Sequence, residues 1–546
     1  MKVDLFDNLL SSIEIKKEKR RKIWKMKRKT ALGIILTSLL IGTLGLMFNV
    51  GLVRAQALNL QWNFTFAPYN YLQTFCPSPA VADLGINLNG SEPGLDLEIV
   101  TGTDEFGGTG SPLNRWHCFD STGAQEWVLP TGCDQSRTSV AIADINGDGN
   151  LEIAGGTTSG WQLQVFDNTG RFIWRYWPWY YELWKSSPAI CDINPYVPGL
   201  EVIAATSGLI YLSEVFCFSG TTGSVLWRYP LGGTESSPAC GDVDGDGYVE
   251  VVIGSFGGNV YCLDGTTGAL ERVYACVGAP CLSSAALANV DADPNLEVII
   301  GSGGWIHCFD GGWTVLQWVF PTSGWVVSSP AVGDVDGDGG YEVVVGSMDS
   351  NVYCLNATTG ALEWRYLTGG PIVSSAALAN RGGSGLGIYI GSMDGSLYLL
   401  DGVGTLLNSY PTGATLGITS SPAVADIDGD LKLEVMFTDC GNPPWPVATT
   451  FWVLNDSAST CTSHAIEWQM FRHDPCHTGT YPKAAALAYK SDLARVGAAS
   501  SKTDIHQGEA ELVHDVAITS LVPSKILTVA GEDINIYVGV ENQGNY

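Results

Sequence analysis

Charged side chains are scarce in this chain, and basic ones are scarcer still. Asp, Glu, Lys and Arg make up only 15% of its 546 residues. Residues 1–30 hold 11 of the 28 Lys and Arg but only 4 of the 56 Asp and Glu. The remaining chain is therefore strongly acidic and would repel a phosphate backbone, so we expect no nucleic acid partner.

Motifs for the common enzyme chemistries are also missing. The seven His are scattered, and the sequence contains no recognisable Ser/His/Asp arrangement, phosphate-binding Walker loop or dinucleotide-binding glycine fingerprint. Gly and Trp are abundant instead, at 66 and 18 residues, which is typical of many short strands joined by tight turns. The sequence thus predicts a scaffold more firmly than an activity.

The N-terminal region predicts a membrane anchor. A basic cytoplasmic segment, 1–30, precedes an uncharged run, 31–53, that is long enough to span a bilayer as a transmembrane helix. The basic flank keeps the N-terminus cytoplasmic, which places the bulk of the protein outside the cell. Ala55 and Ala57 leave cleavage open, in which case the protein would be secreted. We favour an uncleaved signal-anchor because the apolar run exceeds the usual core of a signal peptide.

One module recurs through residues 58–481. Each copy starts with a small-residue turn such as Ser-Pro-Ala-Val, and a serine marks the turn in all eight copies: Ser78, Ser139, Ser187, Ser237, Ser284, Ser329, Ser375 and Ser421. Four short apolar strands follow in each copy. Such repeats predict an all-β fold, an eight-bladed β-propeller. Seven blades are the alternative because the seventh repeat is degenerate at 380–385, and the strand around Trp62 is placed to close the ring against the last blade.

An acidic loop separates the first two strands of several copies. Asp242, Asp244, Asp246 and Glu250 place four carboxylates at offsets 0, 2, 4 and 8, the oxygen-rich arrangement that Ca²⁺ prefers. Three further loops match: Asp144, Asn146, Asp148, Asn150 and Glu152; Asp334, Asp336, Asp338 and Glu342; and Asp426, Asp428, Asp430 and Glu434. A weaker version spans 289–297. We predict structural Ca²⁺ in at least some loops, with metal-free Asx turns as the alternative.

Two families resemble this repeat. The third-strand turn and its Trp, as in Thr359-Gly360 with Trp364, resemble the tryptophan-docking motif of quinoprotein (PQQ-like) propellers, and the acidic loops resemble FG-GAP repeats of integrin α chains. The first resemblance implies that each Trp packs between blades. It also raises a PQQ-dependent oxidoreductase as a function, but that family carries an adjacent Cys pair at its axis, and no two of the 14 Cys here are adjacent. We therefore expect no PQQ.

The remaining cysteines and histidines suggest structural roles. One strand position carries Cys in five blades, Cys118, Cys217, Cys262, Cys308 and Cys354, which predicts small buried side chains. Cys276 with Cys281, and Cys440 with Cys461, are the candidate disulfides. The segment 468–479 contains His473, Asp474 and His477, which could bind a metal, but its resemblance to an element flanking PQQ-like surface propellers favours a closing clasp.

The chain changes character after the repeats. Residues 482–511 have the composition of a linker, and 512–546 resemble the start of a CARDB-type, immunoglobulin-like adhesion domain. About three strands cannot close a β-sandwich, so this part predicts a partial domain.

Taken together, these features predict a non-catalytic, membrane-anchored extracellular propeller that recognises a protein or glycan at the cell surface. The alternatives are a PQQ-dependent oxidoreductase and a carbohydrate-active enzyme. A deep polar pocket on the propeller axis would favour an enzyme, whereas a plugged axis would favour a binding module.

Overall fold

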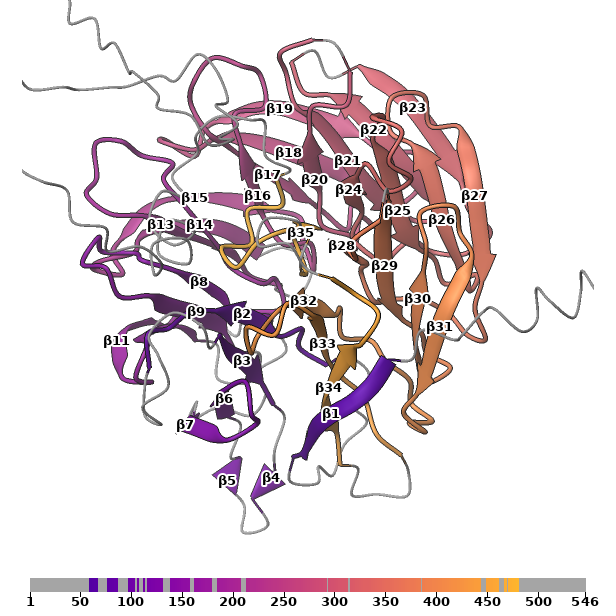
Figure 1. Cartoon of the computed structure of the whole chain (residues 1–546). Coiled ribbons are helices and arrows are strands. Elements are labelled where there is room, and N and C mark those ends of the chain that lie inside the picture. Colours follow the sequence, from indigo (N-terminus) through magenta and orange to yellow (C-terminus); the bar gives the residue numbers. More distant parts are fainter. Residues whose placement is uncertain are drawn as a thin grey trace, which may run out of the picture. The chain divides into compact units, whose positions relative to one another are not determined.

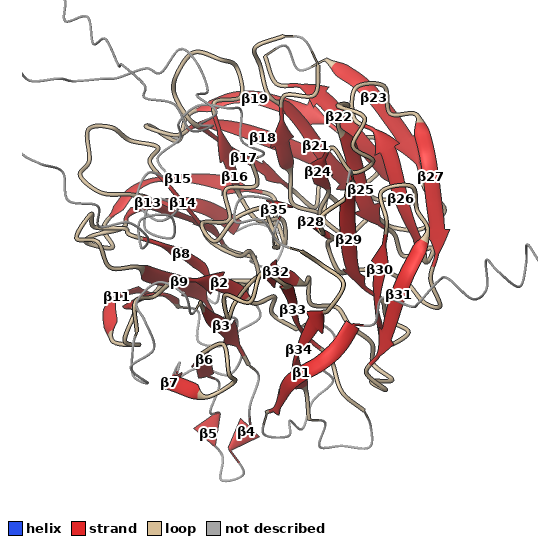
Figure 2. Cartoon of the chain, viewed as in Figure 1, coloured by secondary structure: helices blue, strands red, loops and turns tan. Residues whose placement is uncertain are grey.

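The computed structural model describes the repeat region. It covers residues 58–480 except for 67–75, 87–96, 104–105, 108–110, 113–114, 131–137, 158–161, 179–183, 208–212, 292, 313–314, 384, 443–447, 461–465 and 469. The chain divides into two compact units, Met1–Ala499 and Ser500–Tyr546. The described residues all belong to the first unit and form strands and loops without a helix (Figure 2).

The described residues form eight antiparallel blades of four strands each, with a fifth strand added to the sheet of blade 7 (Figure 1). Blades 1 to 4 are β2(Ala80–Ala82) β3(Glu98–Gly102) β6(Arg115–Phe119) β7(Gln125–Pro130); β8(Ala141–Ala143) β9(Glu152–Gly156) β10(Leu163–Asp167) β11(Phe172–Tyr176); β12(Ala189–Cys191) β13(Glu201–Ala205) β14(Ser213–Ser219) β15(Val225–Leu231); and β16(Ala239–Gly241) β17(Glu250–Gly254) β18(Asn259–Asp264) β19(Leu270–Ala275). A short ribbon, β4(Phe106–Gly107) with β5(Ser111–Pro112), extends blade 1.

Blades 5 to 8 repeat this plan. They are β20(Ala286–Ala288) β21(Glu297–Ser302) β22(Trp305–Asp310) β23(Leu316–Pro321); β24(Ala331–Gly333) β25(Glu342–Gly346) β26(Asn351–Asn356) β27(Leu362–Leu367); β28(Ala377–Asn380) β29(Leu386–Gly391) β30(Ser396–Leu400) β31(Leu406–Pro411); and β32(Ala423–Ala425) β33(Leu433–Thr438) β34(Thr450–Asp456) β1(Leu58–Thr65). A last strand, β35(Ile466–Trp468), pairs with β28.

The ring closes with eight blades. The first strand of the chain, β1, pairs antiparallel with β34 and becomes the outer strand of blade 8, as the Trp62 segment predicted. Each blade's innermost strand contacts the next, and β32 of blade 8 returns to contact β2 of blade 1. The seven-blade alternative is therefore wrong, because the degenerate seventh repeat still forms four strands.

The serines that mark the repeats form a hydrogen-bonded ring. Each serine backbone N–H donates to the hydroxyl of the serine one blade further on, from Ser78 to Ser139 at 3.0 Å and onward through the copies. The eighth bond, from Ser421 N–H to the Ser78 hydroxyl at 2.9 Å, completes the circle. All eight serines are buried, so each amide needs such a partner, and the repeat of one small hydroxyl residue follows from this ring.

Burial decreases from the axis to the rim of each blade. In blade 6 the three residues of β24 and the five of β25 are all buried, because neighbouring blades cover both faces. The outer strand β27 instead alternates half-buried and exposed side chains. Second strands such as Val343–Val345 are therefore continuously β-branched, whereas outer strands alternate.

Tryptophans on the outer strands dock onto the next blade. Indole Nε1–H groups donate to a turn carbonyl of the following blade in six interfaces, from Trp62, Trp127, Trp174, Trp227, Trp318 and Trp364. Beneath Trp318 lies Gly360, whose φ is +68° and whose added Cβ would stand 2.6 Å from the indole. The turn therefore requires a glycine, because the indole of the preceding blade lies directly against it. Trp318 belongs to this set although its own blade has no Thr-Gly turn.

The five aligned cysteines are fully buried in their strands, which confirms their predicted role as small core residues. Other predictions fall outside the described residues: the transmembrane helix at 31–53, the linker at 482–511 and the immunoglobulin-like piece at 512–546. Among the residues that the structure does describe, none belongs to a helix able to cross a membrane.

Candidate functional site

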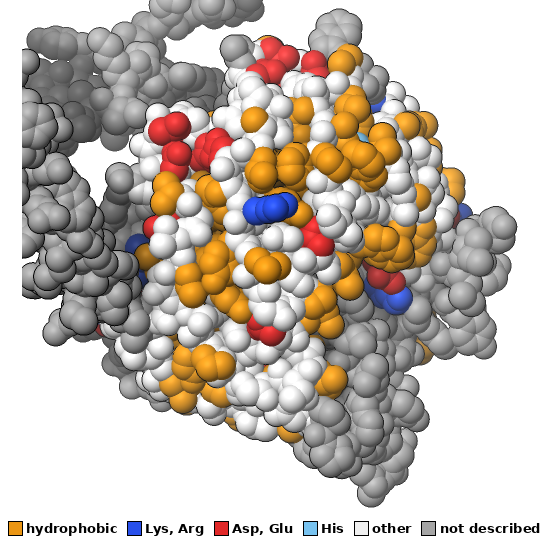
Figure 3. Space-filling view, turned by 90° about the vertical axis from the view of Figure 1, so that its right-hand side faces the viewer, with side chains coloured by type: hydrophobic (Ala, Val, Ile, Leu, Met, Phe, Trp, Pro, Cys, Tyr) orange, Lys and Arg blue, Asp and Glu red, His pale blue; other side chains and the backbone are white. Residues whose placement is uncertain are grey.

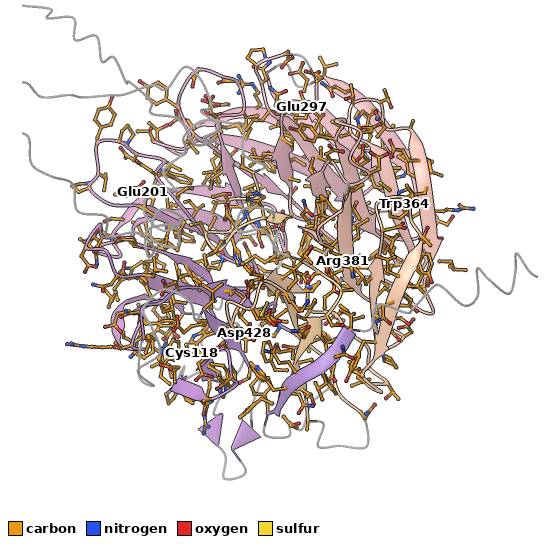
Figure 4. The ribbon with its side chains drawn as sticks, in the orientation of Figure 1. Cys118, Glu201, Glu297, Trp364, Arg381 and Asp428 are labelled. Carbon is orange, nitrogen blue, oxygen red and sulfur yellow. The ribbon has the colours of Figure 1, made fainter. Side chains whose placement is uncertain are left out.

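The acidic loops share one face of the propeller. Each loop joins the first and second strands of its blade, and the Thr-Gly turns join the third and fourth. In an antiparallel meander these two connections lie at the same end of the sheet. The loops are nevertheless separate sites, because each belongs to its own blade; Glu297 of blade 5 and Asp428 of blade 8 lie far apart around the ring in Figure 4.

Four loops bring three carboxylates together, with ligand atoms within 4.8 Å of one another. The groups are Asp242, Asp244 and Asp246; Asp291, Asp293 and Glu297; Asp334, Asp336 and Glu342; and Asp426, Asp428 and Glu434. Three predicted loops are thus partly assembled, and the weaker one at 289–297 joins them. Asp338, Asp430 and Glu250 lie outside these groups. In the first two, a carboxylate oxygen turns to the amide two residues on, at 2.7 and 2.8 Å.

A buried glutamate anchors each loop from below. In blade 6, Glu342 starts β25 and accepts the Val335 amide through Oε2 at 2.9 Å. The same bond, accepted from the backbone amide seven residues earlier, is made by Glu152, Glu250, Glu297 and Glu434. Burial, opposed by this hydrogen bond, raises the pKa of Glu342 to about 8. A divalent cation beside the second oxygen would offset the desolvation of the charged form.

Asx turns hold the loop backbone in place. Asp334 accepts the amides of Gly337 and Gly339 through its two oxygens at 2.9 and 3.0 Å, and Asp426 accepts Gly429 and Leu431 in the same way. A carboxylate oxygen has two lone pairs, so these bonds still allow each to ligate a cation. The metal-free alternative is consistent with the same hydrogen bonds.

The loop at 144–152 is assembled differently from its prediction. Asn146 donates its amide to Glu152 Oε1 at 3.2 Å, and Asn150 donates to Asp148 Oδ1 at 2.8 Å. The hydrogen bonds from Asn150 lower the pKa of Asp148. The two Asn amides stabilise these carboxylates by donation but leave their charge in place. Amides also donate to loop carboxylates in blades 5 and 8, where Gln317 reaches Glu297 and Asn455 reaches Glu434.

The loop at Asp242 contains a cation supplied by the protein. Arg272 donates from Nη2 to Asp244 Oδ2 at 2.6 Å. Arg272 stands opposite Cys262 in the strand pairing of blade 4. Other blades have the docking Trp at this position, for example Trp364 opposite Cys354 in blade 6. The Arg272 guanidinium competes with an external cation for this loop, although the loop has the clearest carboxylate spacing in the sequence.

A further polar side chain reaches these loops from the outer strand, which sequence reasoning missed. The residue before the docking position is Glu271, Gln317, Glu363 or Gln61 in the four blades with a carboxylate group. Gln317 Nε2 donates to Asp291 Oδ2 at 3.0 Å, and Gln61 Nε2 donates to Asp428 Oδ2 at 3.1 Å. Burial and the charges of Asp336 and Asp338 raise the pKa of Glu363. The signal was available in part: blades 2, 3 and 7 carry Ile173, Leu226 and Leu407 there, but blade 1, with no carboxylate group among its described residues, carries Glu126.

Blade 7 replaces the acidic loop with an internal ion pair. Gly387 stands where blade 6 has Glu342, and a Cβ there would meet the Arg381 side chain at 2.3 Å. Arg381 Nε and Nη2 donate to the two Asp456 oxygens at 2.5 and 2.8 Å, and Tyr389 donates to the same carboxylate at 2.7 Å. Arg381 therefore ties blade 7 to blade 8 without a metal.

The segment 466–480, here called the clasp, occupies the axis of the propeller. Successive carbonyls of the clasp accept inner-strand amides of successive blades: Ile142 to Pro475, Ile190 to Cys476, Cys240 to Thr478 and Leu287 to Gly479, at 2.7 to 2.9 Å. Upstream, β35 pairs with β28 of blade 7 and contacts β24 of blade 6. Figure 1 shows β35 near the centre of the ring of inner strands. The clasp thus binds the channel wall from the inside.

Side chains of the clasp fill this channel rather than form an open site. Met470 packs in a core cluster with Ala80 and Ala423 of blades 1 and 8. Arg472 and His477 are 1% and 0% exposed. His477 Nδ1 faces the Pro188 carbonyl at 3.2 Å, while His473 Nδ1 faces the Asp474 carboxylate at 3.2 Å. The predicted clasp is confirmed, and these residues do not converge as a metal site among the described groups.

A recess opens on the face that carries the acidic loops. It has a volume of about 540 Å³ and lies between the loops of blades 6, 7 and 8. Glycines supply much of its wall, and Asp336, Asp401, Arg381 and Thr460 supply polar groups. Asp336 therefore belongs both to the recess and to the blade 6 carboxylate group. On the side of the molecule in Figure 3, acidic side chains occur in small separate groups among hydrophobic and uncharged ones.

The lambda-carrageenase beta-propeller domain model matches residues 308–415, and no curated protein matches. Among solved structures, the V. cholerae biofilm matrix protein Bap1 is similar, with 14% identity, a TM-score of 0.53 and coverage of 78% of this chain and 96% of that one. The quinohemoprotein alcohol dehydrogenase of Comamonas testosteroni has 12% identity, a TM-score of 0.50 and coverage of 74% and 77%. Saccharomyces cerevisiae Sqt1 has 11% identity, a TM-score of 0.53 and coverage of 73% and 99%. At these identities the similarity shows the propeller fold and nothing finer.

Proposed function

We propose that this chain is a non-catalytic recognition propeller, exported and held at the cell surface, whose acidic loops bind Ca²⁺ as structural ions. The observation that carries the proposal is the clasp on the axis. Enzymes built on propellers need a pocket where reactive groups converge, and here the inner strands bond to buried protein instead. The rigid face of loops that remains is suited to recognition.

The recess between blades 6, 7 and 8 is the proposed recognition site, and a glycan is the proposed ligand class. Its polar groups on a glycine-rich wall suit the hydroxyl groups of sugars, and the stretch that matches the lambda-carrageenase propeller model includes most of its lining. Asp336 joins the recess to the blade 6 carboxylate group, so we propose that Ca²⁺ in that loop orders the site. A protein ligand is the other possible outcome.

The test is a binding screen of the full-length protein against a glycan array, in Ca²⁺ and after chelation. Gly383 lines the recess, and a Cβ there would meet no atom within 4 Å, so Gly383→Trp should block the recess without disturbing the fold. Gly232 has equally open space outside the recess, which makes Gly232→Trp the matched control. Loss of glycan binding in the first variant alone would support the proposal, and equal binding by both would reject the recess.

A quinoprotein oxidoreductase is the second candidate function, because one similar solved structure is a quinohemoprotein dehydrogenase. The clasp argues against it, since Arg472, His477 and Met470 occupy the axis with almost no exposure. Titration with PQQ, together with dye reduction assays on primary alcohols, decides between the two. Stoichiometric uptake with dye reduction would overturn the recognition proposal.

A further inference from the structure

Two cysteines from opposite ends of the repeat sequence lie side by side in the structure. Cys76 precedes β2 of blade 1, and Cys440 follows β33 of blade 8. Their Sγ atoms are 3.0 Å apart although 364 positions separate them in the sequence. This separation is only about 1 Å longer than a disulfide bond. The sequence had instead suggested Cys461, outside the described residues, as the partner of Cys440.

The surroundings hold both sulfur atoms in this position. The Cys76 amide donates to Thr419 Oγ1 at 3.0 Å, and the Cys440 amide donates to the Gly417 carbonyl at 2.9 Å. Thr419 Oγ1 also lies 3.2 Å from Cys440 Sγ. The side chains are 7% and 0% exposed, so neither sulfur is free to swing into solvent. Little backbone movement is needed to join them.

This pair lies where the ring has to close. Blade 8 is completed by the pairing of β1 with β34, and its inner end meets blade 1 through the bond from Ser421 to Ser78. The other seven blades are each built from one stretch of chain for their four strands, whereas blade 8 combines β1 with β32, β33 and β34, and only hydrogen bonds join these segments, which lie more than 300 residues apart. A covalent link here would convert an open string of blades into a closed ring.

We propose that Cys76 and Cys440 form a disulfide that locks the first blade to the last. The Cys440 thiolate attacks a disulfide of a thiol oxidant, which releases one thiol and forms a mixed disulfide. Cys76, as thiolate, then attacks the Cys440 sulfur and releases the second thiol. Two protons and two electrons leave the protein, and the oxidant is reduced to two thiols. In the cell this step rests on the proposed export, since cytosolic thiols stay reduced.

Both thiols are buried in the finished ring, so exchange takes place before blades 1 and 8 dock. The pair Cys276 and Cys281, at 3.7 Å, lies within one blade and would not lock the ring.

The experiment refolds the full-length protein in a buffer of oxidised and reduced glutathione, which tests the geometry independently of export. Free thiols are alkylated without reduction, and the protein is digested with trypsin. Residues 55–115 contain Cys76 alone, and residues 433–472 contain Cys440 with Cys461. We expect these two peptides to be linked, in Cys461→Ser as well. Alkylated Cys76, or Cys440 linked to Cys461, would overturn the proposal.

A stability measurement adds a second readout. We expect a reductant to lower the Tm of the oxidised protein by about 2–6 °C. Cys440→Ser should remove this sensitivity and expose one more thiol, whereas Cys354→Ser should keep it. Equal Tm values for the oxidised wild type with and without reductant would reject a locking role even if the bond forms.

Discussion

Blades 6 and 7 are neighbours with the same strand order, yet the equivalent position near the acidic-loop end of the second strand holds a carboxylate in blade 6 and no side chain in blade 7. Blade 6 places the buried Glu342 at the start of β25, facing two loop aspartates. Blade 7 has Gly387 there, and the side chain of Arg381 fills the space and pairs with Asp456 of blade 8. One loop gathers negative charge that an outside cation can balance, and the other brings its own cation.

This difference shows what the loops do in the propeller. A buried charge has to be compensated, and either a metal ion or a guanidinium can do so. Blade 4 is intermediate, since Arg272 contacts Asp244 inside an otherwise acidic loop. We therefore expect blades 5, 6 and 8 to respond to Ca²⁺, blade 4 to respond weakly, and blade 7 not at all.

The largest effect is expected where the compensating charge is internal. Arg381→Met should destabilise the protein by about 3–5 kcal/mol, because it leaves Asp456, 0% exposed, as an unpaired buried charge. Urea unfolding with and without Ca²⁺ measures it, and the loss should be the same in both. Arg365→Met, at an exposed site on β27, is the control. A loss that Ca²⁺ restores would contradict the division between the two blades.

The docking tryptophans provide the next largest effect. Trp364 bridges blade 6 to blade 7 through a 2.8 Å bond to the Gly402 carbonyl, whereas Asn408 holds the equivalent position between blades 7 and 8. We expect Trp364→Ala to cost about 2–4 kcal/mol and Asn408→Ala less than about 1 kcal/mol. Denaturant midpoints compare the two. Equal losses would mean that indole docking contributes little at these interfaces.

Ca²⁺ binding should depend on pH in a defined direction. The pKa of Glu342 is raised to about 8 and that of Glu434 to about 8, both by burial, so without metal the folded state holds these protons. Its stability should fall as pH rises from about 4.5 toward 8. Ca²⁺ must displace the protons, so its affinity should rise over the same range, with about 2–3 kcal/mol of stabilisation per site at saturating ion. Calorimetric titration at pH 5.5 and 8 measures this, and tighter binding at the lower pH would refute it.

The smallest effect concerns the donor from the outer strand. Glu363→Gln should weaken Ca²⁺ binding in the blade 6 loop by about 5–10-fold, because it removes one charge next to Asp336 and Asp338. Glu214→Gln on β14 of blade 3, which lacks an acidic loop, removes one negative charge away from these loops and is the control. An unchanged Ca²⁺ affinity in both variants would show that the outer strand does not contribute to the blade 6 calcium site.

The propeller could be predicted from sequence because its units repeat in register. Eight marker serines, the strand patterns and the docking tryptophans all fall at regular spacing, and each reflects a local requirement of one blade. The acidic loops were visible for the same reason. Their actual composition was less predictable: Asp338 and Asp430 turn to nearby amides, Asn146 donates to Glu152 in the loop of blade 2, and Arg272 enters that of blade 4.

What the sequence alone determined was therefore the blade, its core and the placement of its turns, since these depend on neighbours within about 50 residues. The tertiary structure decided which distant groups meet. It decided between eight blades and seven, led the clasp through the axis, paired Arg381 with Asp456 and brought Cys76 to Cys440. These contacts join segments separated by tens to hundreds of residues, and spacing along the chain carries no record of such distances until the blades are arranged in a circle.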